Sequence, residues 1–329
     1  MLRSRRLDVG SSVAGREERV RITGVRTVVV WGPRHLAFGG PYRTALGASA
    51  TSEHAIVFVE TDAGITGIGE ASSVFLRRGR LLARDIDAAI APAVIGEDPR
   101  RIRHLAQRIE ASIDGAEEAK ALLGGKVRDR VPLSYSVPFG EPDQMAGFAA
   151  ERVRAGHRTI KVKIGNGHAR DIAAVAAVRE AIGPDVKLRV DANMALPTAK
   201  DAIRLVAAIE RYDIELVEQP LGPRAMAEVR RGISPPLMAD ESIRTVTDAM
   251  EVIRHGAADI ANVYVSEAGG LLAASKIFTL CEAAGMPCMI GSMPEFGIGT
   301  AAQIHLGVAM TNLGPDSDTC GSLYHAEDI

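Results

Sequence analysis

Two lysines close together in one short segment could carry out acid–base chemistry. Lys161 and Lys163 lie two residues apart in the segment 159–165, which is rich in β-branched residues. In a pleated strand alternate side chains share one face, so both ammonium groups would point the same way. Two buried like charges need an anionic group nearby, and burial beside a second cation lowers the pKa of a lysine, as a general base requires. The alternative is an edge strand that carries two solvated lysines.

Each of the next three apolar segments ends with a carboxylate. The segments span residues 188–193, 214–219 and 236–241, and the acids are Asp191, Glu218 and the adjacent pair Asp240 and Glu241. Three converging carboxylates repel one another unless a cation lies between them. Oxygen ligands on rigid strands suit Mg²⁺, which keeps open positions for water and substrate. The alternative is that each acid caps the helix that follows it, although this does not explain why all of them accompany a lysine pair.

Short apolar segments alternate with helical patterns from residue 131 onward. Strands are expected at residues 131–137, 159–165, 188–193, 214–219, 236–241, 260–266 and 287–292, with a weaker eighth at 313–318. Apolar residues at helical spacing fill intervals such as 169–182, 199–212, 246–255 and 271–284. Repeated strand–helix units predict a (β/α) barrel, in which the chemistry belongs at the C-terminal ends of the strands. A doubly wound sheet is the alternative, but the glycine-rich phosphate turn that it predicts after its first strand is absent from the sequence.

The N-terminal third of the chain has a different pattern. Strands are expected at residues 25–31, 55–61 and 65–70, the last two joined by a turn at Asp62-Ala63-Gly64. Helical spacing follows over residues 81–113, with a break at Pro99. We therefore expect a disordered tail at residues 1–19, an α+β domain at 20–125 and the barrel at 126–329.

Composition narrows the classes of partner. A net charge of −2, a pI of about 6.5 and the lack of a long basic run give no sign of nucleic acid or an anionic membrane as a partner. No apolar stretch is long enough to span a bilayer, and residues 1–19 lack the apolar core of a secretory signal. The three cysteines, Cys281, Cys288 and Cys320, have no metal-ligand spacing, and their odd number argues against a disulfide framework. A cytoplasmic protein is expected.

The order and spacing of these motifs resemble the enolase superfamily. The motifs are Lys161-x-Lys163, Asp191-x-Asn193, Glu218-Gln219-Pro220 and Asp240-Glu241-Ser242. The mandelate racemase and muconate lactonizing enzyme family fits best, in its muconate lactonizing branch, and the resemblance runs from about residue 20 to residue 318. It implies an α/β fold, a modified (β/α)7β TIM-like barrel beneath an N-terminal α+β capping domain. It also implies a homo-oligomer.

The resemblance assigns a role to each motif. Asp191, Glu218 and Asp240 would bind Mg²⁺. Lys163 would be the base that takes the proton α to a carboxylate, and Lys161 would assist electrostatically. A divalent cation offsets the charge of the enediolate that such a step forms.

Further candidates lie around these motifs. Glu295 matches a carboxylate near the end of the seventh strand and is a catalytic candidate. Asn193, Ser136 at the end of the first strand and Tyr42 are candidate substrate contacts. The loops 32–47 and 71–80 would cover the site and select the substrate.

The sixth strand departs from the resemblance. In this branch it presents a second lysine opposite the Lys-x-Lys pair, and alignment on residues 266–270 puts Tyr264 there. A tyrosine with an ordinary pKa near ~10 is a poor base at neutral pH but can donate a proton or hydrogen bond. Glu241, which would otherwise pair with that lysine, is expected to bond Tyr264. The alternative for Tyr264 is an aromatic residue that lines the barrel without a chemical role.

Two departures concern the architecture. The linker at residues 109–125 is short, and the chain ends at Ile329, before the expected return to the capping domain. Either the protein is shortened at these two places or residues are missing from the sequence, and a loosened cap would admit water.

The expected function is that of a Mg²⁺-dependent isomerase or lyase that acts on a small carboxylate through an enediolate. The tyrosine favours one-base chemistry such as cycloisomerisation or syn-dehydration. A racemase or epimerase of a small carboxylate or amino-acid derivative, and a non-catalytic metal-binding relative, are the alternatives.

Overall fold

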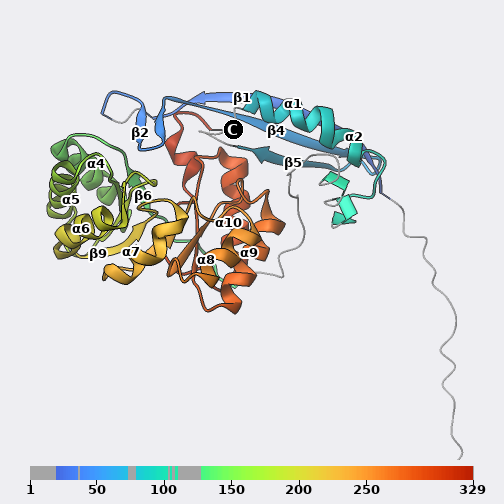
Figure 1. Ribbon diagram of the computed structural model, residues 1–329. Helices are drawn as coiled ribbons and strands as arrows, with labels where there is room; N and C mark the ends of the chain where they lie inside the picture. The colour runs from blue at the N-terminus through green and yellow to red at the C-terminus, as the bar shows by residue number, and fades with distance from the viewer. Residues whose placement is uncertain are drawn as a thin grey trace, which may run out of the picture.

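The computed structural model describes residues 20–35, 38–72, 79–102, 104–105, 108–109 and 127–328. A barrel of strands and helices lies beneath a long antiparallel sheet in Figure 1. The expected tail at residues 1–19 and nearly all of the linker 109–125 lie outside the described residues. No helix in the described ranges is long and apolar enough to cross a membrane.

Seven parallel strands form the sheet of the barrel. They are β6 (Tyr135–Val137), β7 (Thr159–Lys163), β8 (Lys187–Asp191), β9 (Ile214–Glu218), β10 (Leu237–Ala239), β11 (Ile260–Val263) and β12 (Cys288–Ile290), and they pair in this order. Nearly every strand residue is buried, as expected for a parallel sheet that is covered on its outer face and filled on its inner face. Each strand overlaps the segment that the sequence predicts.

Residues 312–318 close the barrel between its first and last strands. Leu313 forms a parallel bridge with Cys288, and Ser317 forms one with Leu133. The backbone N–H of Asp318 donates to the carbonyl of Ile290 at 2.9 Å. The eighth strand predicted at 313–318 is thus present as single bridges rather than as a continuous strand. The fold is the modified barrel that the resemblance implies, with capping strands from the N-terminal region.

Helices cover the outside of the barrel (Figure 1). They are α4 (Pro142–Arg154), α5 (His168–Ile182), α6 (Ala199–Ile209), α7 (Met226–Gly232), α8 (Val246–Arg254), α9 (Leu271–Ala283) and α10 (Gly297–Ala309), with short 3₁₀ turns η2 (Glu210–Tyr212), η3 (Pro223–Ala225) and η4 (Gly321–Tyr324). Local sequence fixes where some of them begin: the Thr198 hydroxyl accepts the N–H of Asp201 at the start of α6, and Thr245 with Asp248 forms a capping box on α8. The four helices that the sequence predicts are confirmed.

The cap is a three-stranded antiparallel sheet with helices packed against it. Its strands are β1 (Ile22–Pro33), β4 (Thr51–Thr61) and β5 (Thr66–Ala71), in the order β1–β4–β5, and the helical segments are α1 (Gly79–Asp85), η1 (Ile86–Ile90) and α2 (Ala91–Val94). A two-stranded hairpin, β2 (Tyr42–Thr44) and β3 (Gly47–Ser49), belongs to the same region. Gly64 adopts φ +74° in the turn between β4 and β5, where the sequence predicts a hairpin.

The C-terminal segment returns to the cap. Arg34 forms an antiparallel bridge with His325. The N–H of His35 donates to the carbonyl of Tyr324 at 2.8 Å, and the N–H of Ala326 donates to the carbonyl of Pro33 at 3.1 Å. The expectation that the chain ends before it reaches the capping domain is therefore wrong. The short 3₁₀ turn η4 redirects the chain, so only a few residues after the barrel closes are needed to reach β1.

A buried carboxylate of the cap forms a second junction with the barrel. Glu70 of β5 accepts the N–H groups of Phe296 at 3.0 Å and Gly299 at 2.8 Å, at the start of α10. His54 Nδ1 lies 2.5 Å from Glu70 Oε1, and neither side chain is exposed. A carboxylate at a helix N-terminus satisfies free N–H groups and interacts favourably with the helix dipole. The cap is thereby fixed to the barrel directly after a loop that borders the pocket described next.

Candidate active site

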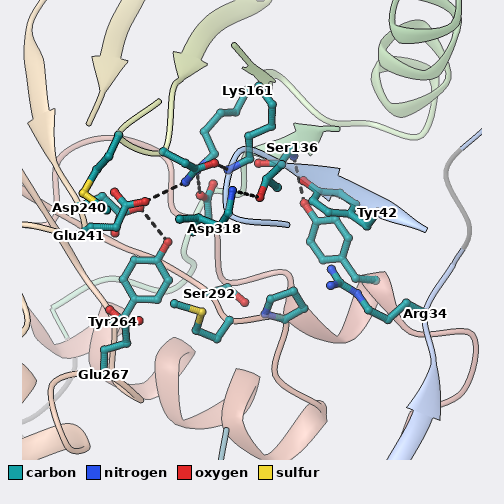
Figure 2. Close-up of a pocket in the computed structure, with 18 of the residues that line it drawn as sticks. Arg34, Tyr42, Ser136, Lys161, Asp240, Glu241, Tyr264, Glu267, Ser292 and Asp318 are labelled. Carbon is teal, nitrogen blue, oxygen red and sulfur yellow. Dashed lines mark hydrogen bonds and ion pairs between the residues drawn. The ribbon is translucent and has the colours of Figure 1, made fainter. Parts of the chain in front are cut away.

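A pocket of about 300 Å³ lies between the cap and the C-terminal ends of the barrel strands (Figure 2). The cap contributes Arg34 and the hairpin residues Tyr42, Thr44 and Leu46. These residues confirm that loop 32–47 covers the pocket; of the second predicted loop, 71–80, residues 73–78 lie outside the described residues. The size suits a small organic ligand.

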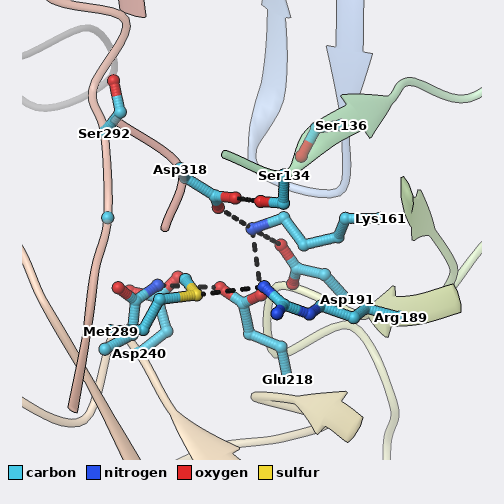
Figure 3. Close-up of polar contacts among 12 residues, drawn as sticks. Ser134, Ser136, Lys161, Arg189, Asp191, Glu218, Asp240, Met289, Ser292 and Asp318 are labelled. Carbon is cyan, nitrogen blue, oxygen red and sulfur yellow. Dashed lines mark hydrogen bonds and ion pairs between the residues drawn. The ribbon is translucent and has the colours of Figure 1, made fainter. Parts of the chain in front are cut away.

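Lys161 lies at the centre of a group of buried carboxylates (Figure 3). Its Nζ is 2.9 Å from Glu218 Oε2 and 3.6 Å from Asp191 Oδ2, and it also forms an ion pair with Asp318. Burial opposes its charge most strongly, yet the surrounding acids, Asp318 first, raise the pKa of Lys161 well above its ordinary value. Lys161 therefore stays charged and offsets several negative groups at once.

Lys163 lies on the same face of β7 as Lys161, but its ammonium group has other hydrogen-bond partners. Its Nζ is 2.5 Å from Asp191 Oδ2 and 2.9 Å from Asn193 Oδ1. Burial lowers the pKa of Lys163 and Lys161 lowers it further, but the charge of Asp191 helps to raise it above its ordinary value overall. The expectation that the pKa of Lys163 is lowered overall is wrong. The reason is that a carboxylate lies in direct contact with the ammonium group.

Asp191, Glu218 and Asp240 come together as the sequence predicts. One oxygen from each carboxylate lies within 4.8 Å of the others, and all three residues are buried. Burial, followed by the charges of Glu241 and Glu218, raises the pKa of Asp240 well above its ordinary value. Burial and Asp191 likewise raise the pKa of Glu218. The group thus has more negative charge than its lysines offset, and its all-oxygen ligands fit a hard divalent cation such as Mg²⁺.

Buried amides hold these carboxylates in place. Asn262 Nδ2 donates to Glu218 Oε1 at 3.0 Å, and Gln219 Oε1 accepts the N–H of Asp240 at 2.7 Å. Asp191 Oδ1 accepts the N–H of Asn193 at 2.9 Å. Gln219 and Asn193 adopt positive φ at the strand ends, +32° and +43°. Such strained backbone at several strand ends in one site is typical of functional sites, where the surroundings enforce the conformation.

Tyr264 at the end of the β11 segment reaches the acid group from another side. Its hydroxyl donates to Asp240 Oδ2 at 3.1 Å, and burial followed by the charge of Asp240 raises the pKa of Tyr264 well above its ordinary value. Gly291 makes room for the ring, since a Cβ there would lie 2.3 Å from the nearest ring carbon. Tyr264 is thus a hydrogen-bond donor at neutral pH.

Glu241 does not bond Tyr264, contrary to the prediction. Its Oε1 accepts from Asn193 Nδ2 at 3.0 Å, while Asp240 takes the tyrosine hydroxyl. Burial and the charge of Asp191 raise the pKa of Glu241 to about 7. Consecutive residues at a strand end point in different directions, so only one of the two acids can face Tyr264.

Glu295 lies beside the pocket but is not among the residues that line it. It is 2% exposed, and it accepts hydrogen bonds from Ser266 Oγ at 3.1 Å and Ser292 Oγ at 2.6 Å. Its neighbours Ser292 and Pro294 form the pocket wall. These contacts favour a role in shaping the loop before α10 over the predicted catalytic role.

The three predicted substrate contacts all line the pocket. Asn193 lies between Lys163 and Glu241. Ser136 belongs to the barrel strand β6, and Tyr42 belongs to the hairpin of the cap. The N–H of Ser136 donates to the hydroxyl of Tyr324 at 3.0 Å.

Asp318 is a site residue that the sequence reasoning missed. It ends the weak eighth segment, pairs with Lys161 and accepts the Ser134 hydroxyl. Its carboxylate at a strand end is the same signal that identified Asp191, Glu218 and Asp240. It went unrecognised because the segment itself is a weak strand pattern.

Comparison with known proteins identifies the family. Residues 25–124 match the family described as "Mandelate racemase / muconate lactonizing enzyme, N-terminal domain", and residues 144–329 match "Enolase C-terminal domain-like". The chain belongs to the mandelate racemase/muconate lactonizing enzyme family of the enolase superfamily.

Several relatives are named enzymes. A hydrophobic dipeptide epimerase from Enterococcus faecalis is 36% identical over 297 residues, which cover 83% of this chain and 84% of the relative. A muconate cycloisomerase from Acinetobacter lwoffii is 29% identical over 294 residues, 81% of this chain and 77% of the relative. The crystal structure of the Enterococcus faecalis V583 dipeptide epimerase with Mg and L-Leu-L-Tyr superposes with a TM-score of 0.87 and 32% identity, covering 94% of this chain and 92% of that one.

Proposed function

We propose that this protein is a Mg²⁺-dependent isomerase or lyase that removes the proton α to the carboxylate of a small acid, with Lys163 as its one base. The observation that carries the proposal is the placement of Lys163 and Tyr264 around one group of buried carboxylates. β7 and β11 lie four strands apart in a barrel closed by the eighth segment, so the two side chains approach from opposite walls. A lysine base on one wall and a tyrosine donor on the other favour chemistry on a single face of the substrate.

The carboxylates Asp191, Glu218 and Asp240 would hold the metal. When bound, Mg²⁺ supplies positive charge that stabilises the enediolate oxygens. Lys163 takes the α-proton at Nζ, and it must first be neutral. Its contact with Asp191 at 2.5 Å keeps it protonated. Asp191 would attract the ammonium less as a metal ligand, and this would favour the neutral form of Lys163 that a base needs. Lys161 stays cationic and offsets charge beside the developing enediolate.

Tyr264 complements Lys163 without replacing it. Since the pKa of its hydroxyl is raised, Tyr264 keeps its proton in the neutral range and can donate but not accept a proton. Cycloisomerisation and syn-dehydration need a base on one face only, and both agree with this arrangement. Two expectations from the family resemblance, a small carboxylate substrate and a homo-oligomeric assembly, stay predictions.

Epimerisation of a dipeptide is the second candidate. Its support is the similarity to the dipeptide epimerase of Enterococcus faecalis, at 36% identity. An epimerase must remove the α-proton from either face, so it would need Tyr264, or a group near it, to act as a second base.

Proton exchange in D₂O separates these functions. Dipeptides, muconolactone and N-succinyl amino acids, each with Mg²⁺, are followed by NMR for loss of the α-proton signal. We expect exchange with at least one acid, at one enantiomer only, and none with Lys163→Ala. Exchange from both enantiomers would identify an epimerase. Mg²⁺ binding without exchange in any of these acids would contradict the proposal and favour a non-catalytic relative.

A further inference from the structure

Arg34 is a buried cation that faces the pocket from the cap. It follows the end of β1, where its N–H donates to the carbonyl of Ala50 at 2.9 Å and its backbone pairs with His325. Its side chain lines the pocket, although the residue is only 3% exposed. Backbone contacts on both sides therefore hold this side chain at the pocket wall (Figure 2).

The Arg34 guanidinium has no acidic partner in the described part of the chain. Two aromatic rings lie beside it: Cζ is 5.0 Å from the ring centre of Tyr42 and 5.8 Å from the ring centre of Tyr324. Its buried Nε has no hydrogen-bond partner. Cation–π contacts offset only part of the cost of burying a charge, and a buried arginine is normally paired with a carboxylate or phosphate.

The other cations of the pocket are paired, which sets Arg34 apart. Lys161 contacts Glu218 and Asp318, and Lys163 contacts Asp191. Arg244 lies 3.4 Å from Glu267 on the far wall. Among the described residues that line the pocket, Arg34 is therefore the cation without a carboxylate.

We infer that Arg34, backed by Tyr42 and Tyr324, binds a second carboxylate of the substrate, so that the substrate is a dicarboxylic acid. This inference rests on the proposed function, in which the first carboxylate of the substrate binds the metal that Asp191, Glu218 and Asp240 would hold. Figure 2 shows Arg34 and Asp240 on opposite sides of the pocket, so a ligand that spans the pocket reaches both.

The chemistry of this wall favours a carboxylate over a phosphate. One planar guanidinium matches the two oxygens of a carboxylate and balances its single charge. Within the described residues no second cation of the wall accompanies Arg34, as a phosphate dianion would require. Arg43, on the neighbouring hairpin strand, is exposed and is not among the pocket residues.

Matched pairs of ligands test the subsite directly. Succinate, glutarate and adipate are compared with their monoamides, which have nearly the same shape and one charge less. Binding to the full-length protein is measured by calorimetry with Mg²⁺. We expect the wild type to bind at least one diacid about 10-fold or more tightly than its monoamide, as expected for a charge-assisted hydrogen bond.

Variants assign this preference to Arg34. Arg34→Gln should remove the preference by weakening the diacid to the level of its monoamide, and Arg34→Lys, which keeps the charge, should retain part of it. The control Arg43→Gln should behave as the wild type. If Arg34→Gln weakens diacid and monoamide equally, the residue only packs against the tyrosines and the inference is overturned. Equal binding of diacid and monoamide by the wild type, or no binding of either, also overturns it, as does tighter binding of 3-phosphonopropionate than of succinate.

The same titrations without Mg²⁺ separate this inference from the proposed function. Diacid binding that depends on Arg34 but not on Mg²⁺ supports the subsite and contradicts the metal-centred function. Diacid binding that depends on Mg²⁺ but not on Arg34 supports the metal-centred function and contradicts the subsite.

Discussion

Replacing Lys161 with methionine tests whether the site depends on this one buried charge. Lys161 is 2% exposed and its ammonium contacts Glu218 and Asp318, with Asp191 3.6 Å away. Methionine has a similar length and no charge, so Lys161→Met keeps most of the packing. The carboxylates would then face one another without a compensating cation.

The expected loss of stability is large. Removing one partner of a buried ion pair costs about 3–5 kcal/mol, because the other charge stays buried and unpaired. At about 2–4 °C per kcal/mol for a domain of this order of size, the unfolding temperature should fall by roughly 10 °C.

The loss should also depend on pH. Burial raises the pKa of Asp318, but the charge of Lys161 outweighs this and holds it below its ordinary value. A carboxyl group with a lowered pKa in the folded state stabilises the fold above its unfolded pKa, and this contribution disappears as pH falls through the folded pKa. In Lys161→Met the acids take up protons more readily, which relieves their repulsion. The difference in unfolding free energy between wild type and variant should therefore be larger at pH 8 than at pH 5.

Chemical and thermal unfolding without Mg²⁺ measure this effect, and Lys187→Met is the matched control. Lys187 also lies near two carboxylates, Glu215 at 3.4 Å and Asp316 at 3.6 Å, but its side chain is 49% exposed. Exposed pairs contribute at most about 1 kcal/mol, so the control should stay close to the wild type. Saturating Mg²⁺ should narrow the gap for Lys161→Met, since the cation offsets the same carboxylates. A variant within about 1 kcal/mol of the wild type would refute the view that Lys161 balances this group.

Substitutions at three further residues test the proposed chemistry. Asp191→Asn should abolish Mg²⁺ binding in calorimetry, and unchanged affinity would remove this residue from the ligand set. Lys163→Ala should abolish α-proton exchange in D₂O with Mg²⁺ binding intact, and Lys163→Arg should not restore it, because guanidinium keeps its proton; exchange in either variant would point to another base. Tyr264→Phe should slow a step that needs proton donation by about 10²-fold and leave exchange detectable. The control Tyr212→Phe removes a partly buried hydroxyl that accepts from Arg211 outside the pocket, and it should match the wild type. Equal rates for wild type and Tyr264→Phe would make Tyr264 a lining residue only.

The sequence was sufficient to predict the barrel and the group of converging carboxylates. Strand–helix alternation predicts parallel strands, and parallel strands bring their C-terminal ends to one rim whatever their exact lengths. Asp191, Glu218 and Asp240 therefore converge even though the predicted strand boundaries differ from the observed ones by a few residues. Asp318 follows the same rule. Its segment forms only single bridges rather than a continuous strand, and its sequence has a correspondingly weak strand pattern.

The partners of individual side chains could not be predicted in the same way. Which of Asp240 and Glu241 faces Tyr264 depends on the backbone angles at the strand end. The pKa of Lys163 depends on a contact of 2.5 Å with Asp191, and sequence spacing does not specify such distances. The role inferred for Arg34 depends on its having aromatic rings and no acidic partner among the described residues, which only the folded arrangement reveals.

The junctions between cap and barrel constrain the order in which the molecule assembles. Arg34 pairs with His325, and Glu70 accepts the N–H of Phe296, 226 residues further along the chain. Contacts between such distant residues form late, because closing a long loop costs entropy before any contact compensates for it. During synthesis the strands of the cap emerge first and must wait for the end of the chain. In refolding, we expect helical signal to recover before ligand binding, since the pocket exists only after the cap has docked.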